Sequence, residues 1–241
     1  MAVPSPLTPR QTVAVLLTLT VVTGLVDAVS SLRLGHVCVA NMTGNVVFLG
    51  FTVTPHSSLS AVASVIAIAG FVLGALAGGR AAHHLASRPG RWLATAFAAE
   101  SVVLAAVAVL TGTGVLPYGG DGKYATIAVL AAALGVQNST VRHLGAADLT
   151  TTVLTLTLTG LTADSSLAGG AGAKPHRRLG SVAAMLAGAA AGAGLLRVSP
   201  TAVIAVAAVL VGLVAAVFLT TVPSAAMAPG MRTTGGAASH E

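Results

Sequence analysis

Residues 24–45 read GLVDAVSSLRLGHVCVANMTGN. The first half of this stretch completes an apolar run that begins at residue 12, and it contains one acid, Asp27. The second half gathers small and polar residues within five positions: Asn41, Thr43, Gly44 and Asn45. Asparagine and aspartate are costly inside a membrane helix. The stretch therefore predicts a helix that crosses a bilayer and is followed by a polar interruption.

The composition of the whole chain agrees with a membrane protein. Of its 241 residues, 55% are hydrophobic and only 7% are charged, whereas a soluble domain has about 25% charged residues. The mean hydropathy is +0.90. These values exclude a soluble enzyme, a disordered chain and a disulfide scaffold, and they make the lipid bilayer the expected partner. The 12 Lys and Arg residues form no basic stripe with aromatics, so no nucleic-acid partner is expected.

Six apolar stretches are each about 20 residues long, the length that a helix needs to cross about 30 Å of hydrocarbon. They are residues 12–32, 59–79, 92–112, 124–143, 179–196 and 201–222. The sequence therefore predicts an all-α, polytopic membrane helix bundle with six spanning helices. Trp92, Tyr118 and Tyr124 lie at or near the ends of these stretches, where aromatic rings favour the headgroup region.

Two further stretches, 36–54 and 146–163, are interrupted by polar residues. In the second, Asp148 is followed by a ladder of threonines that begins with Thr150, Thr151 and Thr152. We expect both stretches to be re-entrant or broken segments that do not cross the membrane. The distribution of Lys and Arg decides between this arrangement and eight crossings.

With eight crossings, Lys and Arg divide six against six between the two membrane faces, which gives no orientation signal. With six crossings they divide nine against three, as the positive-inside bias predicts. The nine are Arg10, Arg80, Arg88, Arg91, Arg142, Lys174, Arg177, Arg178 and Arg232, and the three are Arg33, Lys123 and Arg197. The face with nine basic residues is expected to be cytoplasmic and to hold both termini.

The two halves of the chain repeat the same order of features. Gly24-Leu25-Val26-Asp27 resembles Gly135-Val136-Gln137-Asn138, and a Leu-Gly pair and a polar stretch follow in each half. Because each half has three spans, the second half enters the membrane from the opposite side, which gives an inverted repeat. The alternative is chance similarity among helices rich in Gly, Ala and Val. The predicted organisation is a tail (1–11), a first repeat (12–112), a loop (113–123), a second repeat (124–222) and a disordered tail (223–241).

Polar side chains within the membrane are the candidate functional residues, because lipid cannot satisfy them. Asp27 and Glu100 are the only acids inside the six spans. Each is either a proton relay or solute ligand, or a structural carboxyl, which for Asp27 would bond to the neighbouring polar segment. The predicted substrate-binding or pore-lining residues are Asp27, Ser30, Asn41, Thr43, Gly44, Asn45, Glu100, Gln137, Asn138, Asp148, Thr150, Thr151 and Thr152.

Glycines recur at helical spacing in one helix of each half. They are Gly70, Gly74 and Gly78 in the first half and Gly188 and Gly192 in the second. This spacing predicts close helix packing, either within the chain or between the protomers of a homo-oligomer. No phosphate-binding loop, serine nucleophile elbow, HExxH motif or cysteine pair is present. We therefore expect no enzyme activity, no cofactor and no metal site.

The run from Gly24 to Gly35, followed by Ala40-Asn41-Met42-Thr43-Gly44-Asn45, resembles the YoaK family of bacterial integral membrane proteins, which carry a domain of unknown function. The second-half run Gly135–Asn138, followed by Asp148–Thr152, is similar to the second signature of that family. Ser31 departs from the pattern, in which a bulky aromatic is expected. The resemblance covers nearly the whole chain and implies a multi-pass protein of the bacterial inner membrane. It implies no substrate or activity.

The sequence is compatible with two functions. The first is a small-solute permease or channel, whose substrate is a small molecule or an ion and whose polar site lies at the midplane between inverted repeats. The second is a non-transporting assembly or sensor protein whose polar segments are structural.

Overall fold

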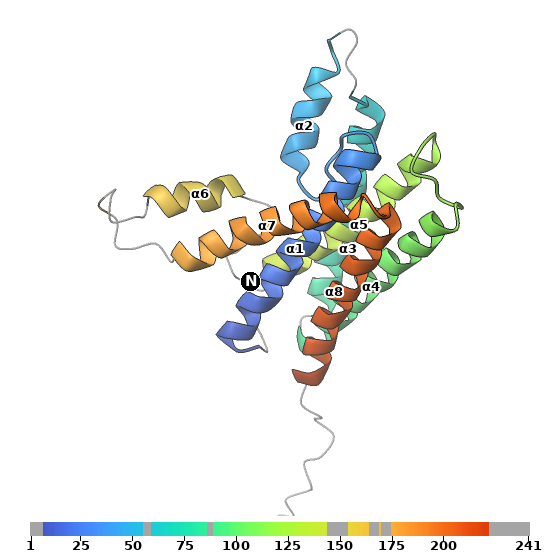
Figure 1. The fold of residues 1–241 in the computed structure, drawn as a ribbon. Coiled ribbons are helices and arrows are strands. Elements are labelled where there is room, and N and C mark those ends of the chain that lie inside the picture. The colour runs from blue at the N-terminus through green and yellow to red at the C-terminus, as the bar shows by residue number, and fades with distance from the viewer. Residues whose placement is uncertain are drawn as a thin grey trace, which may run out of the picture.

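The computed structural model describes residues 7–54, 59–85, 89–143, 154–163, 169 and 175–221. Within these ranges all the regular structure is helical (Figure 1). The helices are α1 (Pro9–Arg33), α2 (Met42–Phe51), α3 (Ala61–His84), α4 (Pro89–Gly112), α5 (Gly122–His143), α6 (Leu154–Ala163), α7 (Pro175–Leu195) and α8 (Pro200–Thr221).

Six of the described helices are long and apolar enough to cross a membrane: α1, α3, α4, α5, α7 and α8. They contain 21 to 25 residues each, and they correspond to the six predicted spans. The prediction of a polytopic bundle with six spanning helices is therefore confirmed. The remaining two, α2 and α6, have ten residues each. A ten-residue helix is about 15 Å long, half the thickness of the hydrocarbon core, and both lie in the stretches predicted to be interrupted.

Several helix ends differ from the predicted spans by a few residues, and for two of them the local reason is clear. α1 begins at Pro9, three residues before the predicted start, because Thr8 and Gln11 form a capping box and a proline occupies the first turn. α3 continues to His84, five residues beyond the predicted end at residue 79. Its last turns are rich in alanine, a strong helix former, and they end in two histidines that complement the helix dipole.

The long helices pack mainly as three pairs: α1 with α7, α3 with α5, and α4 with α8. Smaller contacts join α1 to α8 and α4 to α5, while α3 and α4 make little contact with each other although they are consecutive. α2 packs against α3 and α6 packs against α7; in Figure 1, α2 lies at the top of the view and α6 at its left.

Small residues allow two of these pairs to bring their backbones together. A Cβ atom on Gly74 of α3 would overlap the carbonyl oxygen of Ala132 in α5, and a Cβ on Gly188 of α7 would overlap the carbonyl of Val21 in α1. The other predicted packing glycines, Gly70, Gly78 and Gly192, lie against the same partner helices. All five glycines thus pack against another helix of the same chain.

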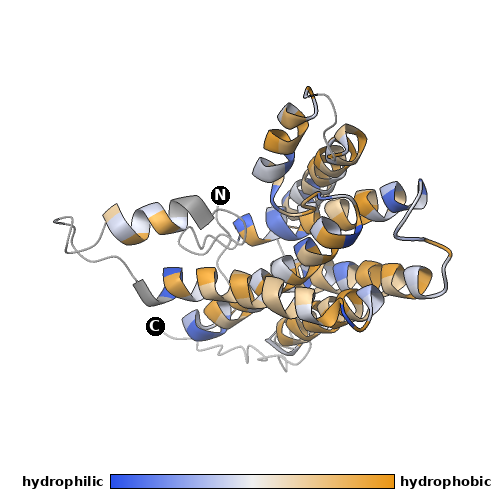
Figure 2. Ribbon diagram, turned by 45° about the horizontal axis from the view of Figure 1, so that its top comes forward, coloured by the Kyte–Doolittle hydropathy of each residue, from blue (hydrophilic) through white to orange (hydrophobic). Residues whose placement is uncertain are grey.

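The outer surface of the bundle is apolar. Large hydrophobic side chains of the spanning helices are exposed, among them Val102, Leu186 and Val209. In Figure 2 the helices are mainly hydrophobic along their length, and hydrophilic turns gather near their ends. Such a surface suits lipid, because hydrocarbon imposes no cost on exposed apolar side chains.

Candidate functional site

The chain reverses direction directly after α1. Gly35 has φ 97° and His36 has φ 58°, two consecutive residues in the left-handed region that glycine adopts most readily. The backbone N–H groups of Val39 and Ala40 then donate to Oδ1 of Asp27, at 2.9 and 3.0 Å. Asp27 lies six residues before the end of α1, or about 9 Å along its axis. Residues 34–41 therefore fold back alongside α1 into the bundle, and we call them the fold-back.

Asp27 holds the fold-back with both carboxylate oxygens. Besides the two bonds to Oδ1, Nδ2 of Asn41 donates to Oδ2. The side chain is only 7% exposed, so each of these bonds replaces one that water would otherwise make. Ser30 donates to the backbone carbonyl of Asp27 at 3.2 Å. These bonds agree with the structural alternative for Asp27.

Asn45, the fourth residue of α2, holds the fold-back from its other side. Its Oδ1 accepts from the backbone N–H of Cys38 at 2.9 Å, and its Nδ2 donates to the carbonyl of the same residue. The side chain is fully buried. Burial raises the pKa of the Cys38 thiol to about 11, with a smaller contribution from the Asp27 carboxylate.

Two neighbouring residues contribute less to this network. Thr43 is exposed on α2. A Cβ on Gly44 would meet the sulfur of Cys38 at 3.6 Å, an ordinary contact. The Gly44 position therefore has room for a Cβ atom.

The second half contributes one direct link to this region. Nε2 of Gln137 in α5 donates to Oγ1 of Thr23, one helical turn before Asp27 in α1, at 3.3 Å. Asn138 donates to the carbonyl of Leu134 in its own helix at 2.8 Å. Asp148, Thr150, Thr151 and Thr152, predicted for the same site, lie outside the described residues.

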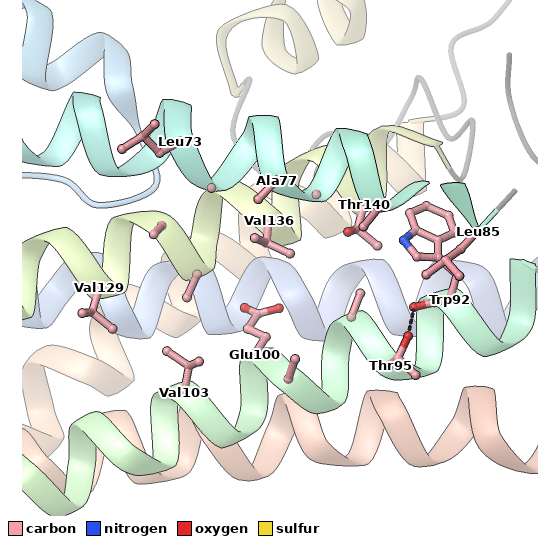
Figure 3. Close-up of a pocket in the computed structure, with 17 residues that line it drawn as sticks. Leu73, Ala77, Leu85, Trp92, Thr95, Glu100, Val103, Val129, Val136 and Thr140 are labelled. Carbon is pink, nitrogen blue, oxygen red and sulfur yellow. Dashed lines mark hydrogen bonds between the residues drawn. The ribbon is translucent and has the colours of Figure 1, made fainter. Parts of the chain in front are cut away.

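Glu100 lies elsewhere, in a cavity of about 630 Å³ bounded by α3, α4 and α5. The cavity occupies the space where α3 and α4 separate, and α5 forms its floor. Figure 3 shows the Glu100 carboxyl pointing into it from α4, with Ala77 of α3 and Val136 of α5 opposite. The side chain is 3% exposed, and neither carboxyl oxygen has a hydrogen-bond partner. The predicted residues thus divide between the fold-back network and this second site.

Unsatisfied polar atoms concentrate in the cavity. Among the described residues, six buried side-chain polar atoms lack a hydrogen-bond partner, and four of them belong to cavity-lining residues. These four are Trp92 Nε1, Glu100 Oε1, Glu100 Oε2 and Thr140 Oγ1. Buried polar groups in proteins are normally paired, so the cavity is the place in the described fold where a bound molecule would satisfy the most groups.

Trp92 and Thr140 were not predicted as site residues. Trp92 lies near the start of α4, which agrees with the expected position of an aromatic ring at the membrane interface. The residue is only 2% exposed, and its ring packs edge-on against His143, with 5.7 Å between the ring centroids. Figure 3 shows Thr140 beside this ring. The sequence marks both residues only as a span-end aromatic and a helical threonine. Their common cavity depends on the pairing of α3 with α5, which no local pattern predicts.

The remaining chemistry of the described residues is limited. They contain no group of three His, Cys, Asp or Glu side chains that could hold a metal ion. The cavity lining has no Lys, Arg or His among its described members. The groups available to a ligand are one carboxyl, one indole N–H and the hydroxyl of Thr140, in apolar surroundings. The hydroxyl of Thr95 donates to the carbonyl of Trp92.

Comparison with known proteins identifies the family. The family described as "Protein of unknown function (DUF1275)" matches residues 15–217. The chain is also 33% identical over 165 residues to the UPF0700 transmembrane protein YoaK of Bacillus subtilis (strain 168), an alignment that covers 65% of this chain and 68% of the relative. No solved structure matches the chain. With a family match over most of its length and six helices able to span a membrane, the chain is an integral membrane protein that belongs to the YoaK (DUF1275) family.

Proposed function

We propose that the protein is a small-solute permease built from two inverted repeats, with its solute site in the cavity around Glu100. The observation that carries this proposal is the Glu100 carboxyl, which is buried in an open cavity without any partner. An ionisable group inside a membrane is costly and in general marks a substrate, ion or proton pathway. A group kept only for structure would be expected to have the partners that Asp27 has.

The position of Glu100 suits a transport site. It lies 11 residues after Pro89 and 12 before Gly112, the ends of α4. At a rise of 1.5 Å per residue, this places it about 17 Å from either end of the helix. Solute sites of secondary transporters lie near the middle of the membrane in the same way.

The helix contacts support the inverted repeat. If α1, α2, α3 and α4 correspond in order to α5, α6, α7 and α8, each contact has a counterpart. The pair α1–α7 corresponds to α5–α3, and α2–α3 corresponds to α6–α7. The contact α1–α8 corresponds to α5–α4, and α4–α8 corresponds to itself. Chance similarity of Gly-rich helices does not require this correspondence.

The glycine contacts agree with the repeat in detail. A Cβ on Gly24 would meet the carbonyl of Met185, and a Cβ on Gly135 would meet that of Phe71. Gly135 follows Gly24 by 111 residues, and Met185 follows Phe71 by 114.

The same two shifts relate a second pair of contacts. Gly74 lies against Ala132, and Gly188 lies against Val21. Ala132 follows Val21 by 111 residues, and Gly188 follows Gly74 by 114. We therefore propose that α1–α7 and α3–α5 are two equivalent units of the repeat.

The proposed orientation follows from the two ends of the bundle. Lys123 Nζ lies 3.6 Å from the place of a Cβ on Gly35, so the end of α1 and the start of α5 share one side. The contact of Trp92 with His143 places the start of α4 and the end of α5 on the other side. Most Lys and Arg residues belong to this second side. We propose that it faces the cytoplasm of a bacterial inner membrane and holds both termini.

Solute uptake into proteoliposomes tests the proposal. Wild-type protein is expected to accelerate the uptake of at least one class of small solutes above the rate of empty vesicles, and Glu100→Gln is expected to abolish this. Val102→Ala is the matched control, because Val102 lies two residues away on the lipid-facing surface and does not line the cavity. Wild-type activity in Glu100→Gln would contradict the proposed site.

A non-transporting assembly or sensor role is the second candidate, and the closed network of Asp27 favours it. Both carboxylate oxygens of Asp27 and both amide atoms of Asn45 bond to groups of the chain itself rather than standing free for a solute. Cysteines placed at residues 77 and 136, on either side of Glu100, discriminate between the roles. A permease would expose them to water-borne thiol reagents, whereas a sealed structural bundle would protect them.

A further inference from the structure

We infer that the cavity around Glu100 binds an elongated, membrane-dissolved amine, with the ammonium group at Glu100 and an oxygen acceptor at Trp92 and Thr140. This inference rests on the proposed function, because it names the ligand class of the same site. Four properties of the cavity support it: the charge of its lining, its unpaired hydrogen-bonding groups, its length and its opening.

Charge determines one end of the ligand. Glu100 is the only charged residue among the described cavity-lining residues, and its two oxygens have no protein donor. An ionised carboxyl in an apolar, buried place requires a cation and hydrogen-bond donors. A protonated amine supplies both, with up to three N–H groups. An anionic ligand would leave two like charges together.

Hydrogen bonding determines the other end. The indole N–H of Trp92 can only donate, and it has no acceptor in the described fold. Thr140 lines the same cavity, and its hydroxyl also has no partner (Figure 3). An ether, ketone or hydroxyl oxygen of a ligand would accept from either group.

The spacing of these groups determines the length and nature of the body. Trp92 and Glu100 are eight residues apart on α4, or about 12 Å along the helix axis. Between them the lining is aliphatic, with Ala96, Ala99, Ala77 and Val136. The ligand is therefore expected to have a narrow apolar body of about that length. The volume of about 630 Å³ lies within the usual range of about 300–1,000 Å³ for small-molecule sites.

Access indicates that the ligand comes from the membrane as a free molecule. Leu73, in the middle of α3, lines the cavity and is also exposed on the outside of the bundle, and α3 makes little contact with α4. The opening is thus apolar and lateral. A lipid with an amine headgroup is a poor occupant, because its headgroup is held at the interface while Glu100 lies about 17 Å from either end of α4.

Intrinsic fluorescence measures this binding directly, since Trp92 is the only tryptophan in the chain. Purified protein is titrated with three probes of equal length: 8-methoxyoctylamine, 8-methoxyoctanol and decylamine. The methoxyamine is expected to shift or quench the fluorescence of Trp92 saturably and to bind about tenfold or more tightly than the alcohol. Glu100→Gln is expected to remove this preference and retain the weak binding of the alcohol, which shows that the cavity is intact.

Further variants test the other groups. Thr140→Val is expected to weaken binding of the methoxyamine and leave the binding of decylamine unchanged, while Val102→Ala changes neither. Equal binding of amine and alcohol, or an unchanged amine preference in Glu100→Gln, would overturn the inference. Saturable amine binding without amine uptake into proteoliposomes would contradict the proposed permease function, while the proposed ligand class would still hold. Uptake of other solutes without amine binding would contradict the ligand class alone.

Discussion

The carboxylate of Asp27 accepts a hydrogen bond of 2.9 Å from the backbone N–H of Val39, although Val39 follows the end of α1 by six residues. The bond ties the fold-back to the helix that it has just left. Ala40 and Asn41 add two further donors to the same carboxylate. Asp27 therefore has a complete set of local partners, and the stability of the fold-back should depend on it.

Asp27→Leu should destabilise the protein strongly. It leaves the buried N–H groups of Val39 and Ala40 without an acceptor, at about 1–3 kcal/mol for each group. Asp27→Asn should cost less, because its amide oxygen can still accept from both. Thermal unfolding in detergent measures the difference.

A swap of partners provides the control for this prediction. In Asp27→Asn the amide nitrogen faces the amide nitrogen of Asn41, so two donors meet. Adding Asn41→Asp restores an acceptor, and the double variant should unfold at a higher temperature than Asp27→Asn alone. If all of these variants unfolded at the wild-type temperature, the carboxylate would not hold the fold-back.

Gly74→Ala should destabilise the α3–α5 pair by about 1–3 kcal/mol or more, because the new Cβ overlaps a backbone carbonyl that cannot move aside alone. Gly79→Ala is the matched control on the same helix. No atom lies within 4 Å of its Cβ position, and alanine favours helix by about 1 kcal/mol over glycine. The order of melting temperatures should be Gly79→Ala at or above wild type, with Gly74→Ala below both.

The thiol of Cys38 should react slowly with water-borne maleimides. The rate of this reaction should keep rising with pH above the pH at which an ordinary thiol is fully ionised. Burial raises the pKa of this thiol to about 11, so the reactive thiolate fraction grows about tenfold per pH unit up to that value. A thiol of ordinary pKa, about 8.5, would reach a plateau earlier. Cys38 is the only cysteine, so mass spectrometry of the labelled protein gives the rate without background. A plateau near pH 9 would contradict the burial of Cys38.

Glu100→Leu should raise the thermal stability while it abolishes solute binding. The variant replaces a buried carboxyl that has no partner with an apolar side chain of similar size, and this commonly stabilises a protein at the expense of its function. Val102→Ala, at a lipid-facing position, should change neither property. A fall in melting temperature for Glu100→Leu would show that the carboxyl serves the fold.

The sequence predicted the spans well because they depend on a local quantity, the length of an apolar run. It also predicted, from the balance of Lys and Arg, that the two polar stretches do not cross. The ten-residue α2 agrees with this for 36–54, while residues 146–153 lie outside the described residues. The sequence left two roles open for Asp27, a functional group or a structural carboxyl. Its bonds to Val39 and Ala40 depend on a chain reversal at Gly35 and His36, which the sequence marks only by a Leu-Gly pair.

The cavity could not be predicted from the sequence. Glu100 was selected because it is an acid in a span. That Trp92 of α4 and Thr140 of α5 line the same cavity depends on tertiary packing, in which α5 pairs with α3 while α4 makes little contact with α3. Gly74 predicts a close contact without naming Ala132 as its partner, because small residues carry no information on which helix approaches them.

The most direct test of the central claim is the site at which a lipid-soluble carbodiimide modifies the protein in membranes. Such a reagent reacts with carboxyl groups that it can reach from hydrocarbon, and peptide mass spectrometry locates the adduct. We expect modification at Glu100 and none at Asp27. We also expect 8-methoxyoctylamine, but not 8-methoxyoctanol, to protect Glu100 from the reagent. Modification of Asp27 with Glu100 untouched would contradict the central claim.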